Sequence, residues 1–358
     1  MFRRVLDVLW SEWFWLPPNV TWNDISNGPN KKYVYAELND VWYQIPLTLL
    51  LLILRLETEK YIFVPLGKSL GVPDKKLRKI PKNPVLEAAY KSSQKLTNPN
   101  GLAKQTDMSQ REVERWWRLR RNQDKTSKLT KFCETSWKAT FLFSSVIFGF
   151  YNVLDKDWFW DVEKIFIYYP HHSYTAAEWW YYMLSTSFYW SLLITHFNDV
   201  RHKDFWLMLT HHILTIGLLV STWTLNLYRL GMMISPLQDS AEALLLLTKS
   251  IHYVDLNFFT YASFISFFVW WFVERLYIFP VYFVWVVFYS FEKHCSMYPA
   301  AMLGLGILCL LLVLHIWWSW LLIVTTYNLL AKEKYQDVRS SESEASESDQ
   351  KEYVNETE

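Results

Sequence analysis

The sequence lacks the short motifs that usually identify an enzyme's cofactor or nucleophile. Its 358 residues contain no glycine-rich nucleotide loop, no zinc-ligand spacing and no serine-centred triad, so we expect neither a metal nor a bound cofactor. The three cysteines, Cys133, Cys295 and Cys309, fit neither a disulfide framework nor a metal site. Internal repeats and paired half-helices are also missing, so a channel or transporter is not favoured.

The opening residues do not form the apolar core of a cleavable signal, because MFRRVLDVLWSEWFW is charged and interrupted. What the chain has in abundance is apolar and aromatic side chains. Hydrophobic residues make up 51% of it and aromatic residues 18%. Tryptophan and tyrosine gather at the two interfaces of a bilayer, so this composition is typical of a membrane protein.

Seven apolar segments follow one another along the chain, and most approach the ~20 residues that a helix needs to cross a bilayer. They lie at 41–56 (with a continuation to about 66), 139–155, 179–197, 205–226, 228–250, 257–282 and 299–327. The segment at 139–155 is the shortest of the last six, and Pro280 interrupts the one at 257–282. We predict an all-α, polytopic membrane protein of about seven transmembrane helices.

The formal net charge of +1 hides a strongly basic stretch. Residues 67–138 contain 18 basic and 7 acidic residues, and positive charge beside a span marks the cytosolic side of the membrane. With seven spans, the amino terminus is then lumenal and the tail cytosolic. The predicted domains are a lumenal segment at 1–40, the first span at 41–66 and a cytosolic module at 67–130. A six-helix domain at 131–330 and an acidic tail at 331–358 follow.

Two candidate modification sites lie near the ends of the chain. Asn19 begins an N-glycosylation sequon in the expected lumenal segment. In the tail, Ser341 and Ser346 each precede an acidic residue by three positions, which suits acidophilic kinases. The tail's polarity and lack of periodicity predict disorder. A solvated tail without a regulatory role is the alternative.

Ionisable residues stand inside two neighbouring apolar segments. His211 and His212 are adjacent in the first, and Asp239 and Glu242 share one helix face in the second, with Lys249 close to that face. A single such residue often only bridges two helices. Four of them in consecutive spans favour a buried polar site, since each costs about 2.5–3.5 kcal/mol to insert into the membrane.

The segment LAKQTDMSQREVERWWRLRRNQDK resembles helices two and three of a homeodomain, with a turn at 108–111 and with Trp116 and Trp117 in the core. DNA binding through the third helix is one interpretation. However, Leu119 occupies the position of the asparagine that pairs with adenine, and leucine cannot make that contact. We therefore expect no sequence-specific DNA partner and favour a helical module whose basic residues meet anionic lipid headgroups.

The stretch 205–253 resembles the Lag1 motif of the TLC-domain ceramide synthases. The matching residues are His211, His212, Thr215, Asn226, Arg229, Asp239 and Lys249. The opening WLPPNVTW and the homeodomain-like segment extend the resemblance over almost the whole chain. The sequence of the homeodomain-like segment is most similar to that of the insect members of the family. The resemblance implies an enzyme that lies among the lipids of the endoplasmic-reticulum membrane and transfers a fatty acyl group from acyl-CoA to a sphingoid base. It also allows homo- or heterodimers.

The resemblance assigns roles to these residues. His211 is the expected acyl acceptor or general base, and His212 is the second candidate or its structural partner. Asp239 is expected to orient an imidazole, with Glu242 as a further catalytic carboxylate. Arg201 and Lys203 are candidate substrate-binding residues that suit CoA phosphates at a cytosolic mouth. Gln238, Lys249 and Arg229 are further candidates. For Arg229 a structural role is favoured over substrate binding.

Three positions depart from the family pattern. A histidine is replaced by Gln238, an aspartate by Glu242 and a glutamate by Leu246. Glutamine cannot shuttle a proton near neutral pH, and catalytic geometry tolerates a shift of about 1 Å poorly. The alternatives to an active enzyme are a catalytically weakened relative that binds or senses lipids and a membrane-tethered regulator. In the family, the link between the last two spans, here about 289–297, influences acyl-chain preference.

Overall fold

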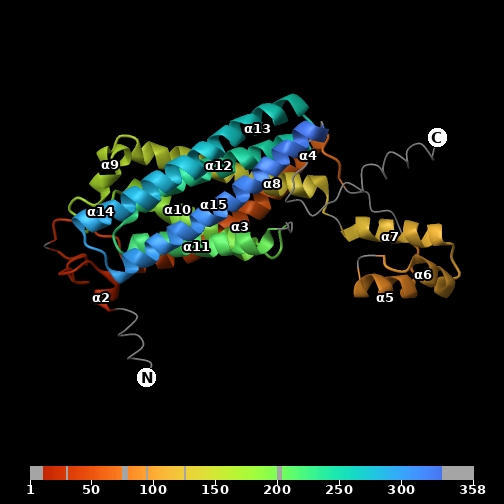
Figure 1. The fold of residues 1–358 in the computed structure, drawn as a ribbon, viewed down its shortest axis with the longest axis horizontal. Helices are drawn as coiled ribbons and strands as arrows, with labels where there is room; N and C mark the ends of the chain where they lie inside the picture. The colour runs from red at the N-terminus through yellow and green to blue at the C-terminus, as the bar shows by residue number, and fades with distance from the viewer. Residues whose placement is uncertain are drawn as a thin grey trace, which may run out of the picture.

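The computed structural model describes residues 11–29, 31–74, 80–93, 96–124, 126–199 and 204–332. Within these ranges the chain is helical and contains no β-strand, as predicted. The long helices run side by side in one bundle, and three short helices lie beyond one end of it (Figure 1). Arg201, Lys203, Ser341 and Ser346 fall outside the described residues.

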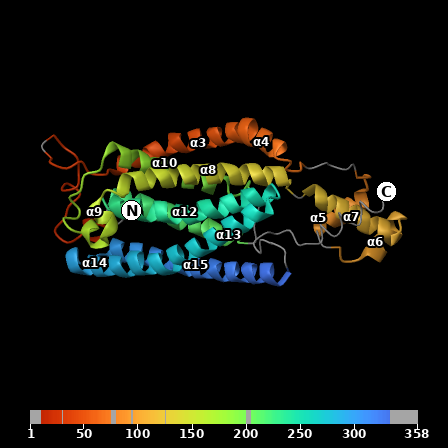
Figure 2. The same ribbon diagram turned by 90° about the horizontal axis from the view of Figure 1, so that it is seen from above.

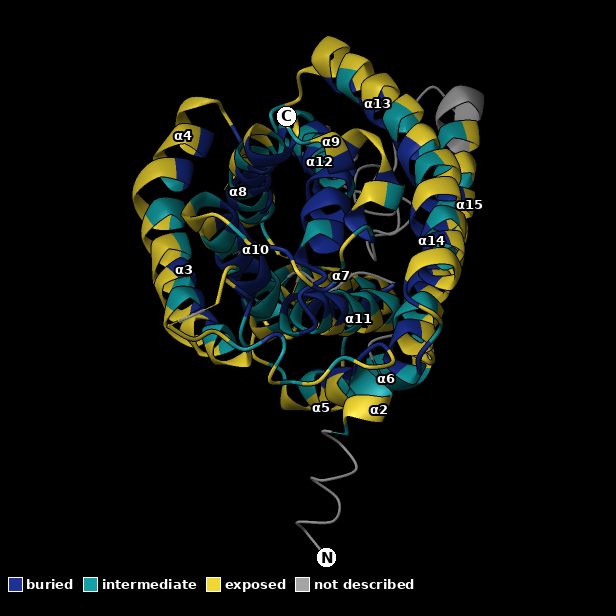
Figure 3. Ribbon diagram, turned by 90° about the vertical axis from the view of Figure 1, so that its left-hand side faces the viewer, coloured by how far each residue is buried: buried dark blue, intermediate teal, exposed yellow. Residues whose placement is uncertain are grey.

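The first long helical segment extends further than its apolar run. A 3₁₀ turn at Leu38–Tyr43 leads into α3 (Gln44–Thr58). A π-helical turn at Glu59–Phe63 and α4 (Val64–Ser69) continue it without a break. This segment packs against α10 and lies on the outer side of the bundle (Figures 2 and 3).

Four helices form the interior of the bundle. They are α8 (Lys128–Val153), α10 (Ala176–Thr195), α11 (Phe205–Thr224) and α12 (Tyr228–Tyr253). Helix α12 packs most extensively against α8 and α13, and most of its residues are buried. Figure 3 looks along the bundle and shows buried residues on α12 and α8, and exposed residues on the outer faces of α3, α13 and α15.

Pro280 does not break the sixth apolar segment, so that prediction was wrong. α13 (Asn257–Phe272), a π-helical stretch (Val273–Val286) and α14 (Val287–His294) form one continuous helical run. Proline lacks an N–H and clashes with the carbonyl of an α-helix four residues earlier. The π-helical hydrogen-bond register accommodates such a residue. The run therefore ends at His294 rather than 282, and only residues 295–298 separate it from α15 (Pro299–Lys332).

Three helical segments in the described ranges are long and apolar enough to cross a membrane. They are Phe205–Thr224, Asn257–His294 and Pro299–Tyr327. The other segments that the sequence predicted as spans lie alongside them in the same bundle. Helix α12 carries Arg229, Asp239, Glu242 and Lys249, and the segment that begins with α3 carries Arg55, Glu57, Glu59 and Lys60.

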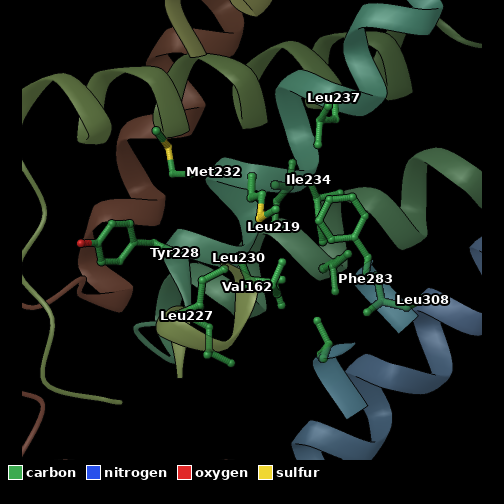
Figure 4. Close-up of a cluster of buried hydrophobic side chains, with 14 of the residues drawn as sticks. Val162, Leu219, Leu227, Tyr228, Leu230, Met232, Ile234, Leu237, Phe283 and Leu308 are labelled. Atoms are coloured by element: carbon green, nitrogen blue, oxygen red, sulfur yellow. The ribbon is translucent and has the colours of Figure 1, made fainter. Parts of the chain in front are cut away.

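A large apolar cluster extends along the bundle from the end away from the short helices. It joins the amino-terminal segment, the connection that contains α9 (Asp157–Trp160) and the turn between α11 and α12. Figure 4 shows part of this cluster, which includes Val162, Leu219, Leu227, Tyr228, Leu230, Met232, Ile234, Leu237, Phe283 and Leu308. This end of the bundle is closed by packed side chains.

The three short helices form a separate core. They are α5 (Pro84–Ser92), α6 (Pro99–Thr106) and α7 (Gln110–Asp124), and their core is distinct from the apolar cluster of the bundle. Their core contains Leu86, Tyr90, Val113, Trp116 and Trp117. The predicted burial of both tryptophans is confirmed. The turn is shorter than expected, because α7 already begins at Gln110, and we call this unit the α5–α7 module.

Candidate functional site

A cavity of about 190 Å³ lies inside the bundle, between α8, α10, α11, α12, the π-helical stretch and α15. At one end it is lined by residues from the start of α8, the start of α11 and the end of α12, including Lys131, Phe205 and Tyr253. This is the end at which the α5–α7 module lies (Figure 1). Thr222 and Gly231 line it near the closed end.

Both histidines of α11 line this cavity, as predicted for a buried polar site. The Nδ1 atoms of His211 and His212 are buried and have no hydrogen-bond partner in the described part of the chain. Aromatic rings hold the imidazoles instead. His211 meets the ring of Trp318 edge-on at 5.4 Å between centroids, and His212 meets His196 at 5.6 Å. Both Nδ1 atoms are thus enclosed with their hydrogen-bonding capacity unused by the described residues.

Asp239 is hydrogen-bonded to a tyrosine rather than to either histidine. Its carboxylate is only 1% exposed and accepts a 2.5 Å hydrogen bond from the hydroxyl of Tyr189 on α10. Tyr189 lines the cavity, so this bond links the carboxylate to the cavity wall. Glu242, one turn further along α12, lines the cavity itself. The expected contact between Asp239 and an imidazole is thus replaced by the contact with Tyr189.

A second polar group in the wall centres on Arg275, which the sequence analysis missed. Its Nη1 donates to Gln238 Oε1 and to His315 Nε2, and its Nη2 donates to the main-chain oxygen of Gln238 at 3.0 Å. Its Nε lies 2.8 Å from the carboxylate of Glu274, and its guanidinium stacks over Trp271. An Arg–Glu pair and a histidine inside apolar runs were the available signal, because such residues usually mark functional sites in membranes.

Ion pairs lie at the end of the cavity nearer the α5–α7 module, which we take as its open end. Asp199 accepts from Arg55 at 2.7 Å and from Lys138 at 2.8 Å, and Lys138 also pairs with Glu134. Lys249 lines this end too. Arg201 and Lys203 lie in the connection between Asp199 and α11, outside the described residues, so their contact with CoA phosphates stays a prediction.

Arg229 lies at the closed end, far along α12 from the open mouth. Its guanidinium sits over the ring of Trp158, which fits its structural interpretation. Burial, together with the positive charge of Arg229, lowers the pKa of His172 in the nearby loop to about 4. Asn19 is exposed, so its side chain is accessible for modification.

This architecture defines a helical membrane protein with a polar cavity inside the bundle. Residues 131–324 match the TLC-domain family. The chain is 34% identical to mouse ceramide synthase 5 over 94% of its own length and 82% of that protein. It is 33% identical to mouse ceramide synthase 4 and 32% identical to human ceramide synthase 3, over 95% and 96% of its length and 87% and 89% of theirs. The chain therefore belongs to the ceramide synthase family of TLC-domain proteins.

Proposed function

We propose that the protein transfers a fatty acyl group from acyl-CoA to the amine of a sphingoid base, giving ceramide or dihydroceramide. The observation that carries this proposal is the placement of His211 and His212, whose Nδ1 atoms have no hydrogen-bond partner among the described residues, in a cavity inside the bundle. The chemistry needs a nitrogen base or nucleophile, and imidazole suits both roles near neutral pH.

The cavity admits two routes for His211. In the covalent route, an imidazole nitrogen attacks the thioester carbon, the C–S bond breaks, and CoA leaves as a thiolate. The amine then attacks the acyl-imidazole and displaces the imidazole. In the direct route, His211 removes a proton from the amine, which attacks the thioester itself. In both routes the sphingoid ammonium loses two protons, of which one ends on the CoA thiol.

The two ends of the cavity suit different parts of acyl-CoA, its reactive acyl group and its charged nucleotide. Apolar side chains that include Leu218, Leu219 and Ile234 line its deeper part, and exclusion of water protects an activated acyl group from hydrolysis. Acyl-CoA carries charged phosphates and reaches the mouth from the aqueous phase. Lys131 and Lys249 line that mouth beside Lys138, which is paired with Glu134 and Asp199, and we assign the nucleotide part of the substrate to this end.

The proposed topology has seven spans. They are α3 with its continuation, α8, α10, α11, α12, the run α13–α14, and α15, all of which extend between the same two ends of the bundle (Figure 1). The basic α5–α7 module lies beyond the open end, so this end is assigned to the cytosol. The closed end, with Asn19, is assigned to the lumen of the endoplasmic reticulum.

The three departures from the family motif all lie on α12. Gln238, Glu242 and Leu246 line the cavity. Gln238, like the histidine it replaces, is a polar residue, and it accepts a hydrogen bond from Arg275 in the cavity wall. Glu242 retains the carboxylate of the aspartate that it replaces. A lipid-binding relative without activity is the alternative that these changes suggest. Glycosylation at Asn19, phosphorylation at Ser341 and Ser346, and dimer formation are further proposals.

The test is acylation of the purified protein. It is incubated in detergent with long-chain acyl-CoA, with and without sphinganine, while intact mass and ceramide yield are recorded. We expect ceramide from the wild type and none from H211A. H171A, which changes an exposed histidine at the opposite end of the bundle, should keep activity. An acyl adduct that is absent from H211A indicates the covalent route. A folded wild type that forms neither ceramide nor adduct contradicts the proposed enzyme.

A further inference from the structure

The side-chain amide of Gln238 has a defined orientation. Arg275 carries only hydrogen-bond donors, so the Gln238 atom that it contacts must be the carbonyl oxygen Oε1. Arg275 is itself held by Glu274, by His315 and by the main-chain oxygen of Gln238. It is only 5% exposed. The guanidinium is therefore a rigid support that fixes which side of the amide is oxygen and which is nitrogen.

The other side of the amide is an unused donor. Gln238 Nε2 is buried and has no hydrogen-bond partner among the residues described. Leaving a buried donor unsatisfied carries a desolvation cost that a bound acceptor would remove. Gln238 lines the same cavity as His211, as does Thr215, whose hydroxyl is likewise buried without a partner. A substrate oxygen in this cavity would satisfy such donors.

We propose that Gln238 Nε2, oriented by Arg275, donates a hydrogen bond to the carbonyl oxygen of the fatty acyl thioester and stabilises the oxyanion formed during acyl transfer. This inference rests on the proposed function. Gln238 is the catalytic residue in it, and Arg275 is a positioning residue.

The step is the same for both routes. An electron pair on nitrogen, from His211 or from the sphingoid amine, forms a bond to the thioester carbon. The π pair of the carbonyl moves onto oxygen, which becomes an oxyanion that accepts the Gln238 hydrogen bond. The carbonyl then re-forms and the C–S bond breaks, so that its electron pair leaves with CoA as the thiolate. Donors of this kind stabilise developing charge without reorganisation.

The replacement of the family's histidine by Gln238 has a consequence under this proposal. An amide N–H₂ donates at every accessible pH, whereas an imidazole alternates between donor and acceptor as it titrates. The substitution therefore preserves a donor while removing a titrating group. We expect Q238H to remain active and to acquire an additional ionisation in its pH–rate profile, which a packing role for Gln238 would not produce.

The main experiment uses the full-length protein and the variant Q238M, which is close in volume but has no donor. We expect kcat to fall about 100-fold, the loss typical of one oxyanion donor, while KM for acyl-CoA is unchanged. The inhibition constant of an S-alkyl-CoA thioether, which has a methylene in place of the carbonyl, should also be unchanged. The control Q44M alters another buried glutamine, which accepts from Trp190 on α10, and should retain kcat.

A second variant covers the case in which Q238M does not fold. Q238E keeps an acceptor for Arg275 but has no N–H, so it should show the same loss of kcat. R275K should lower kcat in the wild-type background and cause no further loss in Q238M, because Arg275 acts through Gln238.

The outcomes separate this inference from the proposed function. If the wild type forms ceramide and Q238M or Q238E keeps its kcat, the oxyanion role is wrong while the enzyme stands. Equal losses in kcat and in thioether binding would mean a packing role and would also overturn it. If the wild type forms no ceramide, the proposed function fails, and the inference fails with it.

Discussion

The hydroxyl of Tyr189 donates a 2.5 Å hydrogen bond to the carboxylate of Asp239 and so joins α10 to α12 in the middle of the bundle. Asp239 is 1% exposed, and a buried carboxylate needs such a partner. The bond also fixes the position of Asp239 relative to the cavity, since Tyr189 is part of its wall. Tyr189 is therefore as much a part of the site as the carboxylate that the motif contains.

We expect Y189F to destabilise the protein and to lower its activity. The change keeps the ring but leaves the carboxylate without its donor, which costs more than losing a neutral bond because the acceptor is ionisable. The thermal midpoint should fall and ceramide formation should drop about tenfold, a change of about 1.4 kcal/mol in the barrier.

The matched control for Y189F is Y182F. Tyr182 is more deeply buried, at 1% exposed, and its hydroxyl contacts only neutral oxygens, those of the Leu219 carbonyl at 2.9 Å and of the Thr222 hydroxyl at 2.6 Å. Y182F should cost only about 1 kcal/mol and leave the turnover of the folded protein intact. Equal effects of Y189F and Y182F on both measurements would show that the carboxylate does not depend on Tyr189.

Asp199 is expected to stabilise the open end of the cavity in a pH-dependent way. Burial alone would raise the pKa of Asp199, but Lys138 and Arg55 hold it below its usual value near 3.8. A carboxyl group with a lowered pKa contributes its stability above its usual pKa and loses it as the pH falls through the lowered value. The wild type should therefore lose thermal stability below about pH 4.

The variant D199N removes this charge at every pH. It leaves Arg55 and Lys138 without their shared carboxylate while their side chains are only 12% and 19% exposed. We expect a loss of about 2 kcal/mol near pH 7, below the 3–5 kcal/mol of a fully buried pair. The control D155N changes an exposed aspartate and should have little effect. Equal thermal midpoints for D199N and the wild type at pH 7 would contradict this account.

The positions of the long helices could be predicted because the apolar pattern determines them directly. The segment expected at 205–226 is α11 at Phe205–Thr224, and the one expected at 228–250 is α12 at Tyr228–Tyr253. The expected break at Pro280 failed because the local rule for proline assumes an α-helical register, and the chain adopts a π-helical one. The early start of α8 was missed because its first turns contain charged residues at the end of the bundle.

The site could be predicted only where its residues are neighbours in the sequence. His211 and His212 are adjacent, and Gln238, Asp239 and Glu242 lie within two turns of α12, so one motif contains them. Their partners come from other helices, and which side chains meet depends on how α10, the π-helical stretch and α15 pack. No local pattern distinguishes Tyr189 among 22 tyrosines.

The α5–α7 module should unfold without loss of catalysis. Leu86 is fully buried at the centre of its separate core, and L86A should cost about 2–5 kcal/mol through the cavity that it leaves. Limited proteolysis should then cleave residues 80–124 rapidly, while ceramide formation by the same sample is unchanged. The control V85A alters an exposed neighbour and should leave the module resistant. Parallel loss of protease resistance and activity in L86A would show that the cavity depends on the module.

Asn226 ties three segments together at the closed end of the bundle. It is fully buried just after α11, and its Nδ2 donates to the carbonyl oxygens of Pro170 and His172. Its Oδ1 accepts from the main-chain nitrogen of Ala36 at 3.2 Å. Its φ of +57° lies in the left-handed region, which asparagine and glycine adopt more readily than other residues. Both the amide and the backbone of this residue are therefore required.

Two substitutions separate these requirements. N226G keeps the left-handed backbone but loses three hydrogen bonds, each contributing about 1 kcal/mol, so we expect a loss of about 3 kcal/mol. N226A loses the same bonds and adds about 1–2 kcal/mol for a left-handed residue with a Cβ. The thermal midpoint should therefore fall in the order wild type, N226G, N226A, and proteolysis of residues 11–43 should accelerate in the same order. An N226G variant as stable as the wild type would mean that the amide bonds do not hold the amino-terminal segment. Equal stability of N226G and N226A would instead show that backbone strain at this position is negligible, and that the side-chain amide alone accounts for asparagine here.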